Sequence, residues 1–192
     1  MIIQDRFAGK VMVVTGGTSG IGKAVCLRAG AEGAKVVIAG RNQARGQAIE
    51  KEIREAGGEA TFIQCDVTQK EDIVNLYAKT IEIYGQLDIA INNAGIVGDS
   101  KKIEDLTDDD WFSVVNANLN AMFYCIREEI KYMLKNENGG AIVNTASVAG
   151  IRATPAGQMC IRDRSAGAAV RRVRGPRKRQ YGGRRGVRVR SV

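Results

Sequence analysis

Short apolar runs rich in Val and Ile recur along this chain, and the stretches between them carry apolar residues at helical spacing. The runs are expected to form strands over residues 10–15, 35–39, 60–65, 87–91 and 140–145. Helices are expected over residues 23–34, 43–56, 69–84 and 107–134. Strands that are apolar throughout and alternate with helices are typical of parallel strands buried on both faces. The pattern therefore predicts an α/β fold with a doubly wound parallel sheet and right-handed crossovers.

Signals at the element ends refine this prediction. Gly85 ends the third expected helix. Thr107 precedes three acidic residues and Asp110 stands three positions after it, which is a variant of the capping box that opens helices. That signal predicts one long helix from Thr107 to about residue 134. The alternation of strands and helices stops after Gly150, so the sheet is expected to be incomplete at its C-terminus, with an exposed edge on the fifth strand.

Charge divides the chain into two compositions. The 192 residues carry 29 Lys and Arg against 21 Asp and Glu, a net charge of +8. Residues 1–157 are mildly acidic, with a net charge of −3, whereas residues 158–192 hold 12 basic side chains and one acid, Asp163. We therefore expect one globular domain over residues 1–157 and a basic tail over residues 158–192 that is non-native or disordered.

The first residues of this tail suggest where it comes from. Gln158–Arg164, QMCIRDR, resembles the translation of a transposon end used in preparing sequencing libraries. On this hypothesis the remainder translates joined or out-of-frame DNA, and the nucleotides coding for residues 155–170 would decide it. The alternative is a functional tail, because clustered cations bind nucleic acid through its phosphates. Tyr181 is the only aromatic ring there that could stack on a base, so nucleic-acid binding is not favoured.

Composition also excludes several kinds of chemistry. The chain has no His, so catalysis by an imidazole base is excluded. Its four cysteines are far apart and lack the spacing of a zinc site, which predicts buried reduced thiols and no metal. Apolar runs are too short for a membrane span, and Asp5 and Arg6 interrupt the N-terminal segment, so neither a membrane protein nor a secretory signal is expected. A cytoplasmic protein is the resulting expectation.

A glycine-rich segment, TGGTSGIG, follows the first expected strand directly and opens the first helix. Gly16 permits a tight turn, Gly20 lets backbone approach a pyrophosphate, and Gly22 lets helix and strand pack closely. The free N–H groups at the start of the helix attract the anion. Because strand, spacing and helix agree, we predict a Rossmann-type dinucleotide site rather than a structural turn alone. The candidate cofactor-binding residues of this segment are Gly16, Thr18, Ser19, Gly20, Ile21 and Gly22.

The end of the second strand distinguishes the two nicotinamide coenzymes. An acid there would hold the ribose 2′-hydroxyl of NAD, whereas an Arg can neutralise the extra phosphate of NADP. The chain reads Ala39-Gly40-Arg41-Asn42, without an acid. The Arg41 guanidinium can grip a phosphate with two parallel hydrogen bonds, so NADP(H) is favoured over NAD(H). The plainer alternative is that Arg41 is an ordinary solvated loop charge.

Several segments together resemble the short-chain dehydrogenase/reductase family. They are TGGTSGIG, Cys65-Asp66-Val67, Asn92-Asn93-Ala94-Gly95, Asn118 within NANLNAMF and Ser147 within IVNTASVAG. The resemblance spans residues 7–157. It implies that Asp66 and Val67 flank the adenine, and that Asn92 lies under the adenosine ribose and steadies the central strand. It also implies that Ser147 orients the substrate carbonyl, while Asn118 holds a helix bend and a water of a proton relay.

The resemblance fails at the residues that would move the proton. Hydride transfer to a carbonyl leaves negative charge on oxygen, which must be hydrogen-bonded and then protonated. In the family, the proton comes from a Tyr thirteen residues after the Ser, and a Lys four residues further on lowers the pKa of that Tyr. In this chain the two positions hold Cys160 and Arg164. Tyr181 lies out of register, and a thiol is a weak donor. We therefore expect the chain as written to be catalytically inactive.

These observations predict an oxidoreductase whose intact form transfers a hydride between NADP(H) and a small-molecule alcohol or ketone, similar to a 3-oxoacyl reductase. The family resemblance also implies a homo-oligomer, and neither a nucleic-acid nor a membrane partner is expected. The alternative is a non-catalytic, dinucleotide-binding regulator whose basic tail binds nucleic acid.

Overall fold

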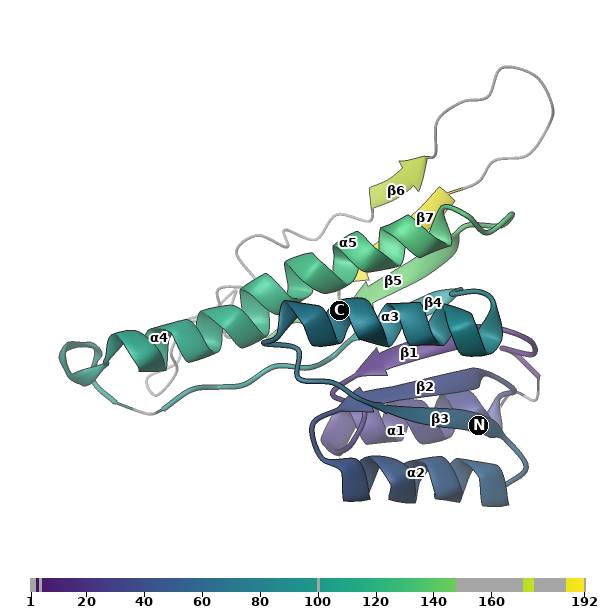
Figure 1. Cartoon of the computed structure of the whole chain (residues 1–192), viewed down its shortest axis with the longest axis horizontal. Coiled ribbons are helices and arrows are strands. Elements are labelled where there is room, and N and C mark those ends of the chain that lie inside the picture. Colours follow the sequence, from purple (N-terminus) through teal and green to yellow (C-terminus); the bar gives the residue numbers. More distant parts are fainter. Residues whose placement is uncertain (1–2, 4, 100, 148–170, 175–185, 192) are drawn as a thin grey trace.

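In the computed structural model, which describes residues 3, 5–99, 101–147, 171–174 and 186–191, a parallel sheet forms the centre of the molecule (Figure 1). Its first five strands are β1 (Val11–Thr15), β2 (Lys35–Gly40), β3 (Glu59–Gln64), β4 (Ile89–Asn92) and β5 (Gly140–Asn144). They lie side by side in the order β3-β2-β1-β4-β5, and each pair is parallel. The chain winds outward from β1 in both directions, which confirms the predicted doubly wound α/β fold.

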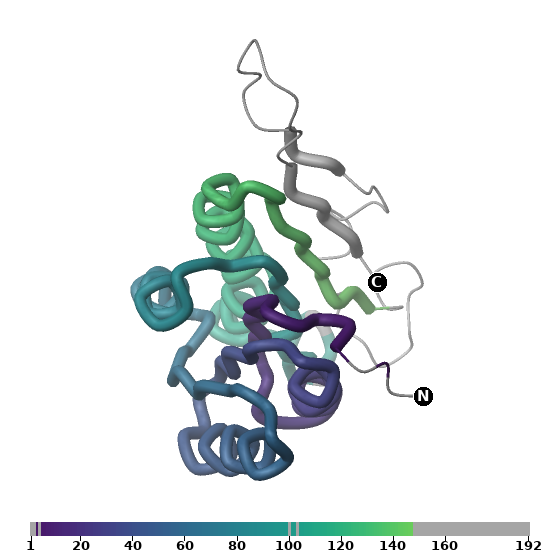
Figure 2. The backbone as a smooth tube through the Cα atoms, turned by 90° about the vertical axis from the view of Figure 1, so that its right-hand side faces the viewer, coloured from purple at the N-terminus to yellow at the C-terminus, as the bar shows by residue number. Residues whose placement is uncertain are grey.

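Helices cover both faces of this sheet (Figure 2). They are α1 (Gly20–Ala31) and α2 (Gln43–Glu55) on one face, and α3 (Lys70–Tyr84) and α5 (Ala121–Met133) on the other. Alternate residues of a strand supply the two cores, since Met12 and Val14 of β1 pack with α1 and α2, whereas Val13 packs with α3 and α5. Burial on both faces explains why the strands are apolar throughout.

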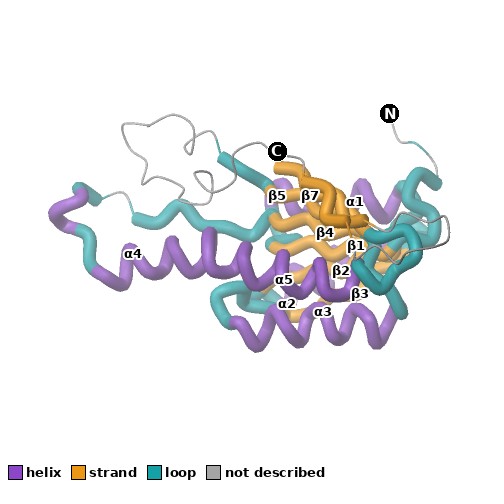
Figure 3. Tube along the Cα trace, turned by 90° about the horizontal axis from the view of Figure 1, so that it is seen from above, coloured by secondary structure: helices purple, strands orange, loops and turns teal. Residues whose placement is uncertain are grey.

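The long helix expected after Thr107 forms, but it is not uniform. It consists of α4 (Asp108–Val115), a π-helical turn η2 (Asn116–Asn120) and α5, which together extend past the sheet as one rod (Figure 3). In the π turn the Ala121 N–H donates to the Asn116 carbonyl, five residues back. Such turns insert an extra residue into the helix and are frequent at functional sites. Apolar periodicity alone does not reveal the insertion.

The capping box predicted at the start of α4 is confirmed. The Asp110 N–H donates to Thr107 Oγ1 at 3.1 Å, and the Thr107 N–H donates back to Asp110 Oδ2 at 2.9 Å. Hydrogen bonds from the Thr107 backbone, Lys101 and the Thr107 hydroxyl lower the pKa of Asp110 to about 2. Because this pKa lies below the usual 3.8, the stabilisation by the carboxylate is present above pH 4 and is lost as the pH falls toward 2.

Replacing Thr107→Ala should therefore lower the free energy of unfolding by about 1 kcal/mol, because the first turn of α4 loses its side-chain acceptor. Urea denaturation at pH 7 measures this loss. The matched control is Thr107→Ser, which keeps the hydroxyl and should unfold at nearly the wild-type midpoint. Equal midpoints for the Ala and Ser variants would contradict the role of this cap.

The sheet extends further than expected. Strands β6 (Arg171–Arg174) and β7 (Gly186–Ser191) form within the basic segment, with β7 parallel to β5 and β6 antiparallel to β7. The expected exposed edge on β5 is therefore wrong, because β7 covers it (Figure 1). Other residues of the segment 158–192 lie outside the described part of the chain, and its non-native origin stays a prediction.

Three of the four thiols are described, and all three are free and buried, as expected: Cys26, Cys65 and Cys125. Burial raises the pKa of both Cys26 and Cys65 to about 12, so these thiols are protonated at neutral pH. Cys160 lies outside the described residues. Within the described ranges, clusters of three or more His, Cys, Asp or Glu suited to a metal ion are absent, and helices long and apolar enough to cross a membrane are absent as well.

Candidate cofactor and active site

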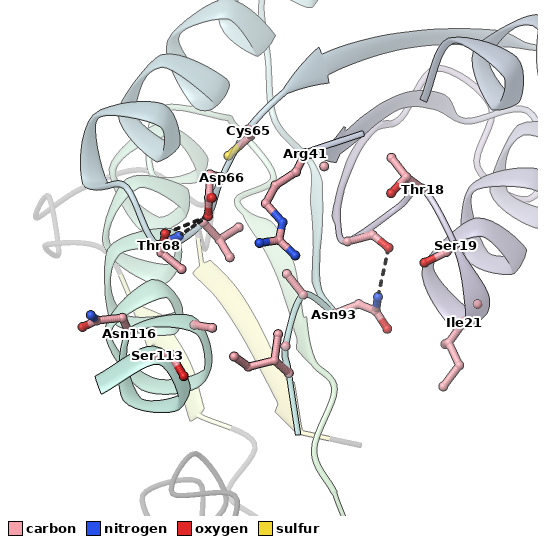
Figure 4. Close-up of a pocket in the computed structure, with 18 residues that line it drawn as sticks. Thr18, Ser19, Ile21, Arg41, Cys65, Asp66, Thr68, Asn93, Ser113 and Asn116 are labelled. Carbon is pink, nitrogen blue, oxygen red and sulfur yellow. Dashed lines mark hydrogen bonds between the residues drawn. The ribbon is translucent and has the colours of Figure 1, made fainter. Parts of the chain in front are cut away.

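A cavity of about 590 Å³ lies beyond the carboxyl ends of the central strands (Figure 4). The chain runs from β1 out to β3 and then crosses back to β4, so the direction of winding reverses between β1 and β4. Ligands of open α/β sheets bind outside the carboxyl ends at such a reversal. The cavity is lined by Gly16, Thr18, Ser19, Gly20, Ile21, Gly40, Arg41, Cys65, Asp66, Val67, Thr68, Asn93, Ala94, Gly95, Ile96, Ser113, Asn116 and Ala117.

Two glycines of the turn after β1 are required by close backbone contacts. Gly16 has a φ of +66°, and a Cβ on it would lie 2.9 Å from the Cα of Ala94. A Cβ on Gly22 would lie 2.2 Å from the carbonyl oxygen of Gly16. Gly22 packs against the backbone of the turn and does not line the cavity, so its place among the cofactor-binding residues stays a prediction. The turn is thus held tightly against both α1 and the segment that follows β4.

The N-terminus of α1 faces the cavity without a side-chain cap. Ser19 is the N-cap residue, but its side chain makes no capping hydrogen bond, and the first turn carries no acidic residue. Thr18, Ser19, Gly20 and Ile21 all line the cavity, and their predicted contact with a cofactor stays a prediction. Unpaired N–H groups at the positive end of a helix dipole form a ready site for phosphate.

Arg41 brings a positive charge to the same cavity from the end of β2. Its side chain is exposed and points into the cavity between Thr18 and Asp66 (Figure 4). The backbone at this point is anchored, because Gln64 Nε2 donates to the Arg41 carbonyl at 3.2 Å and the Asn42 side chain caps α2. The Arg41 guanidinium is therefore placed to meet an anion bound in the cavity.

The segment after β3 forms the opposite wall. Asp66 and Val67 line the cavity, and their predicted place beside the adenine stays a prediction. Asp66 Oδ1 accepts hydrogen bonds from the backbone N–H of Thr68 at 2.9 Å and from its hydroxyl at 2.8 Å. The Asp66 N–H donates to Asp72 Oδ2 at 2.9 Å. These bonds hold the backbone of this wall in one conformation.

Asn92 does not line the cavity, and its predicted contact with the cofactor stays a prediction. Its side chain is buried with that of Ala90, on the face of the sheet covered by α3 and α5, because side chains alternate along β4. Asn93, the next residue, lines the cavity instead, and its Nδ2 donates to the carbonyls of Thr15 at 3.3 Å and Gly16 at 3.4 Å. Its predicted part in steadying the central strand stays a prediction; its Nδ2 donates to Glu129 and Asn144 in the core.

Asn118 lies in the π turn and is buried, with both ends of its amide bound to one backbone residue. Its Oδ1 accepts from the Ile96 N–H at 2.9 Å, and its Nδ2 donates to the Ile96 carbonyl at 2.8 Å. These bonds fasten the loop after β4, which lines the cavity, to the irregular turn of the long helix. The helix irregularity predicted at Asn118 is present. Its predicted part in a proton relay stays a prediction.

Ser147 is described and partly buried, three residues beyond the end of β5. The chain leaves β5 at the carboxyl edge of the sheet, where the cavity also lies. Ser147 does not line the cavity. The two positions where the family places Tyr and Lys, occupied by Cys160 and Arg164, lie outside the described residues. The structure thus places the cavity and Ser147 at the same edge of the sheet, and the catalytic role of Ser147 stays a prediction.

Comparison with known proteins identifies the family. Residues 10–160 match the family described as short chain dehydrogenase. That stretch is most of the chain, and it includes every segment that lines the cavity. The chain belongs to the short-chain dehydrogenase family.

Several short-chain dehydrogenases are similar to it. A 3beta-hydroxysteroid dehydrogenase of Mediterraneibacter gnavus is 56% identical over 153 residues, which cover 80% of this chain and 55% of that protein. A cyclohexanol dehydrogenase of an Acinetobacter species is 37% identical over 150 residues, covering 78% of this chain and 59% of that protein. A short chain dehydrogenase from Burkholderia cenocepacia, solved in complex with NADP, is 34% identical with a TM-score of 0.76, covering 84% of this chain and 65% of the other. The chain thus spans little more than half the length of the curated relatives that it matches.

Short-chain dehydrogenases bind NAD(P), and the residues of this cavity fit such a coenzyme. A Cβ at Gly16 or Gly22 would crowd the glycine turn between β1 and α1, and a Cβ at Gly40 would lie 2.7 Å from the Thr18 side chain. The helix N–H groups suit a diphosphate, and Arg41 suits a further phosphate. The donor set therefore matches an anionic dinucleotide.

Proposed function

We propose that this short-chain dehydrogenase binds NADP(H) and that its intact form transfers a hydride between that coenzyme and a ring alcohol or the corresponding ketone. The observation that carries the proposal is one cavity in which the uncapped N-terminus of α1 and the Arg41 guanidinium face the same space. A dinucleotide with a diphosphate and a separate 2′-phosphate needs both features.

The substrate class follows from the relatives and from the apolar edge of the cavity. The names of two relatives specify a hydroxysteroid and cyclohexanol, both of which carry a hydroxyl group on an alicyclic ring. In this chain Ile96 lines the cavity with 39% of its surface exposed, and the neighbouring Val97 is 77% exposed. Exposed apolar side chains beside a polar cradle suit an apolar ring better than a charged acyl carrier. We therefore favour a ring alcohol over the 3-oxoacyl substrate expected from sequence.

Each part of the site has a defined task in this proposal. The N–H groups of α1 hold the diphosphate, Arg41 pairs with the 2′-phosphate, and Asp66 and Val67 bound the adenine side. When bound, the coenzyme supplies or accepts the hydride. Ser147 would donate a hydrogen bond to the substrate oxygen, where charge develops. Asn118 keeps the loop at Ile96 in place, so that the cavity wall does not move during binding.

The same reasoning makes the chain as written a binding protein without turnover. Cys160 and Arg164 occupy the positions at which the family carries its proton-donating Tyr and assisting Lys. A neutral thiol is a weak hydrogen-bond donor and cannot replace a phenol held beside a cation. We infer that NADPH binds to this chain while its oxidation does not proceed.

The Arg41→Asp variant tests the coenzyme preference. Loss of a charge-assisted pair costs about 1.5–3 kcal/mol, so the Kd for NADPH should rise about 10- to 100-fold while that for NADH falls or stays level. Isothermal titration calorimetry with both coenzymes measures the two constants. The control is Arg45→Asp, an equal charge change at an exposed position of α2 that does not line the cavity. Equal losses of NADPH affinity in both variants would mean that Arg41 is an ordinary solvated loop charge and does not select the coenzyme.

A further inference from the structure

A buried carboxylate that the proposed reaction does not use lies between α5 and the sheet. Glu129 of α5 is completely buried. The Tyr77 hydroxyl of α3 donates to its Oε1 at 2.5 Å, and Asn92 Nδ2 donates to its Oε2 at 3.1 Å. Acidic side chains are almost never fully buried unless they are paired or hydrogen-bonded, so these two contacts fix where the carboxylate lies.

Asn92 extends this contact to the neighbouring strand. Its Nδ2 also donates to Asn144 Oδ1 at 3.0 Å, so both amide hydrogens are engaged. Its Oδ1 has no hydrogen-bond partner among the described residues. A buried acceptor without a partner is unfavourable. The orientation of the Asn92 amide is therefore stabilised by the two hydrogen bonds that its Nδ2 donates. Asn92 and Asn144 are the last residues of β4 and β5, and they form one rung of the parallel ladder.

The two functional segments begin at this rung. Directly after Asn92, the Asn93 N–H donates to Thr15 Oγ1 at 3.1 Å, and its side chain donates to the carbonyls of Thr15 and Gly16 in the glycine turn. Three residues after Asn144 stands Ser147. A displacement of the Asn92–Asn144 pair would therefore move both the glycine turn, where the diphosphate is expected to bind, and the hydroxyl of Ser147.

We propose, on the basis of the proposed function, that Glu129 is a positioning residue of the site, which holds the ends of β4 and β5 together through Asn92 and so sets the glycine turn and Ser147. It touches neither coenzyme nor substrate, because it lies in the core on the side of α3 and α5. A charged acceptor in this place matters because Asn92 presents a donor to it.

The ionisation of Glu129 gives the proposal a measurable signature. Burial raises its pKa to about 7, although the bonds from Tyr77 and Asn92 partly oppose this. The other titratable groups around it are Tyr77 from α3, Cys125 on α5 itself, and Cys65 after β3, which acts on Cys125. The pKa of each is raised, so they stay neutral between pH 6 and 8.

The sign of the effect follows from the charge on the acceptor. Protonation removes the negative charge that strengthens the hydrogen bond from Asn92 Nδ2 to Glu129, so the contact between the ends of β4 and β5 should loosen as the pH falls through 7. Coenzyme affinity should therefore be high at pH 8 and lower at pH 6. Stability should move in the opposite direction, because a folded-state pKa above the ordinary 4.5 means that ionisation costs stability between pH 4.5 and 7.

The test measures the Kd of NADH from pH 6 to 8 on the full 192-residue chain. NADH is used because it lacks the 2′-phosphate of NADPH, and a phosphate monoester itself titrates near pH 6. The wild type should bind about tenfold more tightly at pH 8 than at pH 6. Glu129→Gln, which cannot ionise, should bind at the weaker, low-pH level throughout. A wild-type affinity and pH profile in this variant would overturn the proposal.

Two further variants separate positioning from simple loss of stability. Tyr77→Phe removes a bond that lowers the pKa of Glu129, so the midpoint of the affinity profile should move to higher pH. Glu32→Leu removes another fully buried acid, at the far end of α1, where it pairs with Arg6 and Arg28. It should lower the melting temperature and leave the Kd of NADH unchanged. A rise in Kd as large as that of Glu129→Gln would mean that any buried charge matters equally.

Hydrogen–deuterium exchange of the chain without coenzyme decides the proposal independently of binding. In Glu129→Leu, amides of residues 92–96 and 144–147 should exchange at least about fivefold faster than in the wild type, while those of β2 and β3 stay unchanged. If the wild type binds neither coenzyme, the proposed function fails, and this exchange pattern still tests the rung. Unchanged exchange at both strand ends would show that Glu129 does not hold them.

Discussion

The Gly22→Ala variant is expected to bind NADPH at least about a hundredfold more weakly than the wild type, a loss of ~3 kcal/mol. The added Cβ would lie 2.2 Å from the carbonyl oxygen of Gly16 and 2.7 Å from Asn93 Nδ2. The first of these is backbone and cannot rotate away. The glycine turn must therefore move off the start of α1, which takes the diphosphate-binding N–H groups out of alignment.

Calorimetry with NADPH measures this loss, and circular dichroism verifies that the variant is folded. The matched control is Gly30→Ala in the same helix, where the Cβ would lie 2.7 Å from Cγ2 of Ile53. Ile53 belongs to α2 and does not line the cavity, so the adjustment that this contact forces stays away from the glycine turn. Gly30→Ala should thus lose some stability but keep its affinity. If folded Gly22→Ala binds NADPH with wild-type affinity, the glycine turn and the start of α1 do not hold the diphosphate.

Catalysis should be absent from the chain as written and restored by repair beyond residue 157. We expect no measurable oxidation of NADPH with cyclohexanone or a 3-ketosteroid. Replacing the segment after Arg164 with the corresponding part of the Mediterraneibacter gnavus relative, combined with Cys160→Tyr and Arg164→Lys, should give turnover. A positioned general acid contributes about 10²- to 10⁴-fold to a rate, and the graft supplies the rest of the substrate site. Loss of absorbance at 340 nm reports the reaction.

The control for this repair is the same graft with Cys160 and Arg164 retained. It should bind NADPH as tightly as the repaired chain and turn over at least about a hundredfold more slowly. Activity in the unrepaired chain would show that the interpretation of residues 158–192 is wrong. Binding of both NADPH and DNA, with no turnover even after repair, would favour the non-catalytic regulator.

The core of the fold could be predicted from sequence because parallel strands buried on both faces leave an unmistakable apolar run. All five predicted strands form, with ends that shift by one or two residues. The sequence analysis did not predict β6 and β7, because it assigned residues 158–192 to a tail on the basis of their charge and did not consider their apolar periodicity. Val187 and Val189 alternate with arginines, which is a period of two and hence a strand signal.

The cofactor side of the site was also largely predictable, since its residues follow strand ends directly. Gly16, Arg41 and Asp66 all line the cavity at the places that the motif order implies. A motif gives no side-chain direction, so the sequence could not show that Asn93 lines the cavity while the Asn92 side chain is buried in the core. The Glu129 contacts join residues far apart in sequence, which no local pattern reveals.

The π turn η2 ties the length of the long helix to both the site and the core. Each residue advances about 100° around a helix axis, so the additional residue in η2 rotates everything after it by that angle. The face of α5 that carries Cys125, Glu129 and Met133 meets the sheet only with this rotation. A single-residue insertion or deletion between Ala121 and Cys125 would rotate these side chains away from the sheet. The same change in the connection at residues 135–139, beyond the helix, would leave their orientation unchanged.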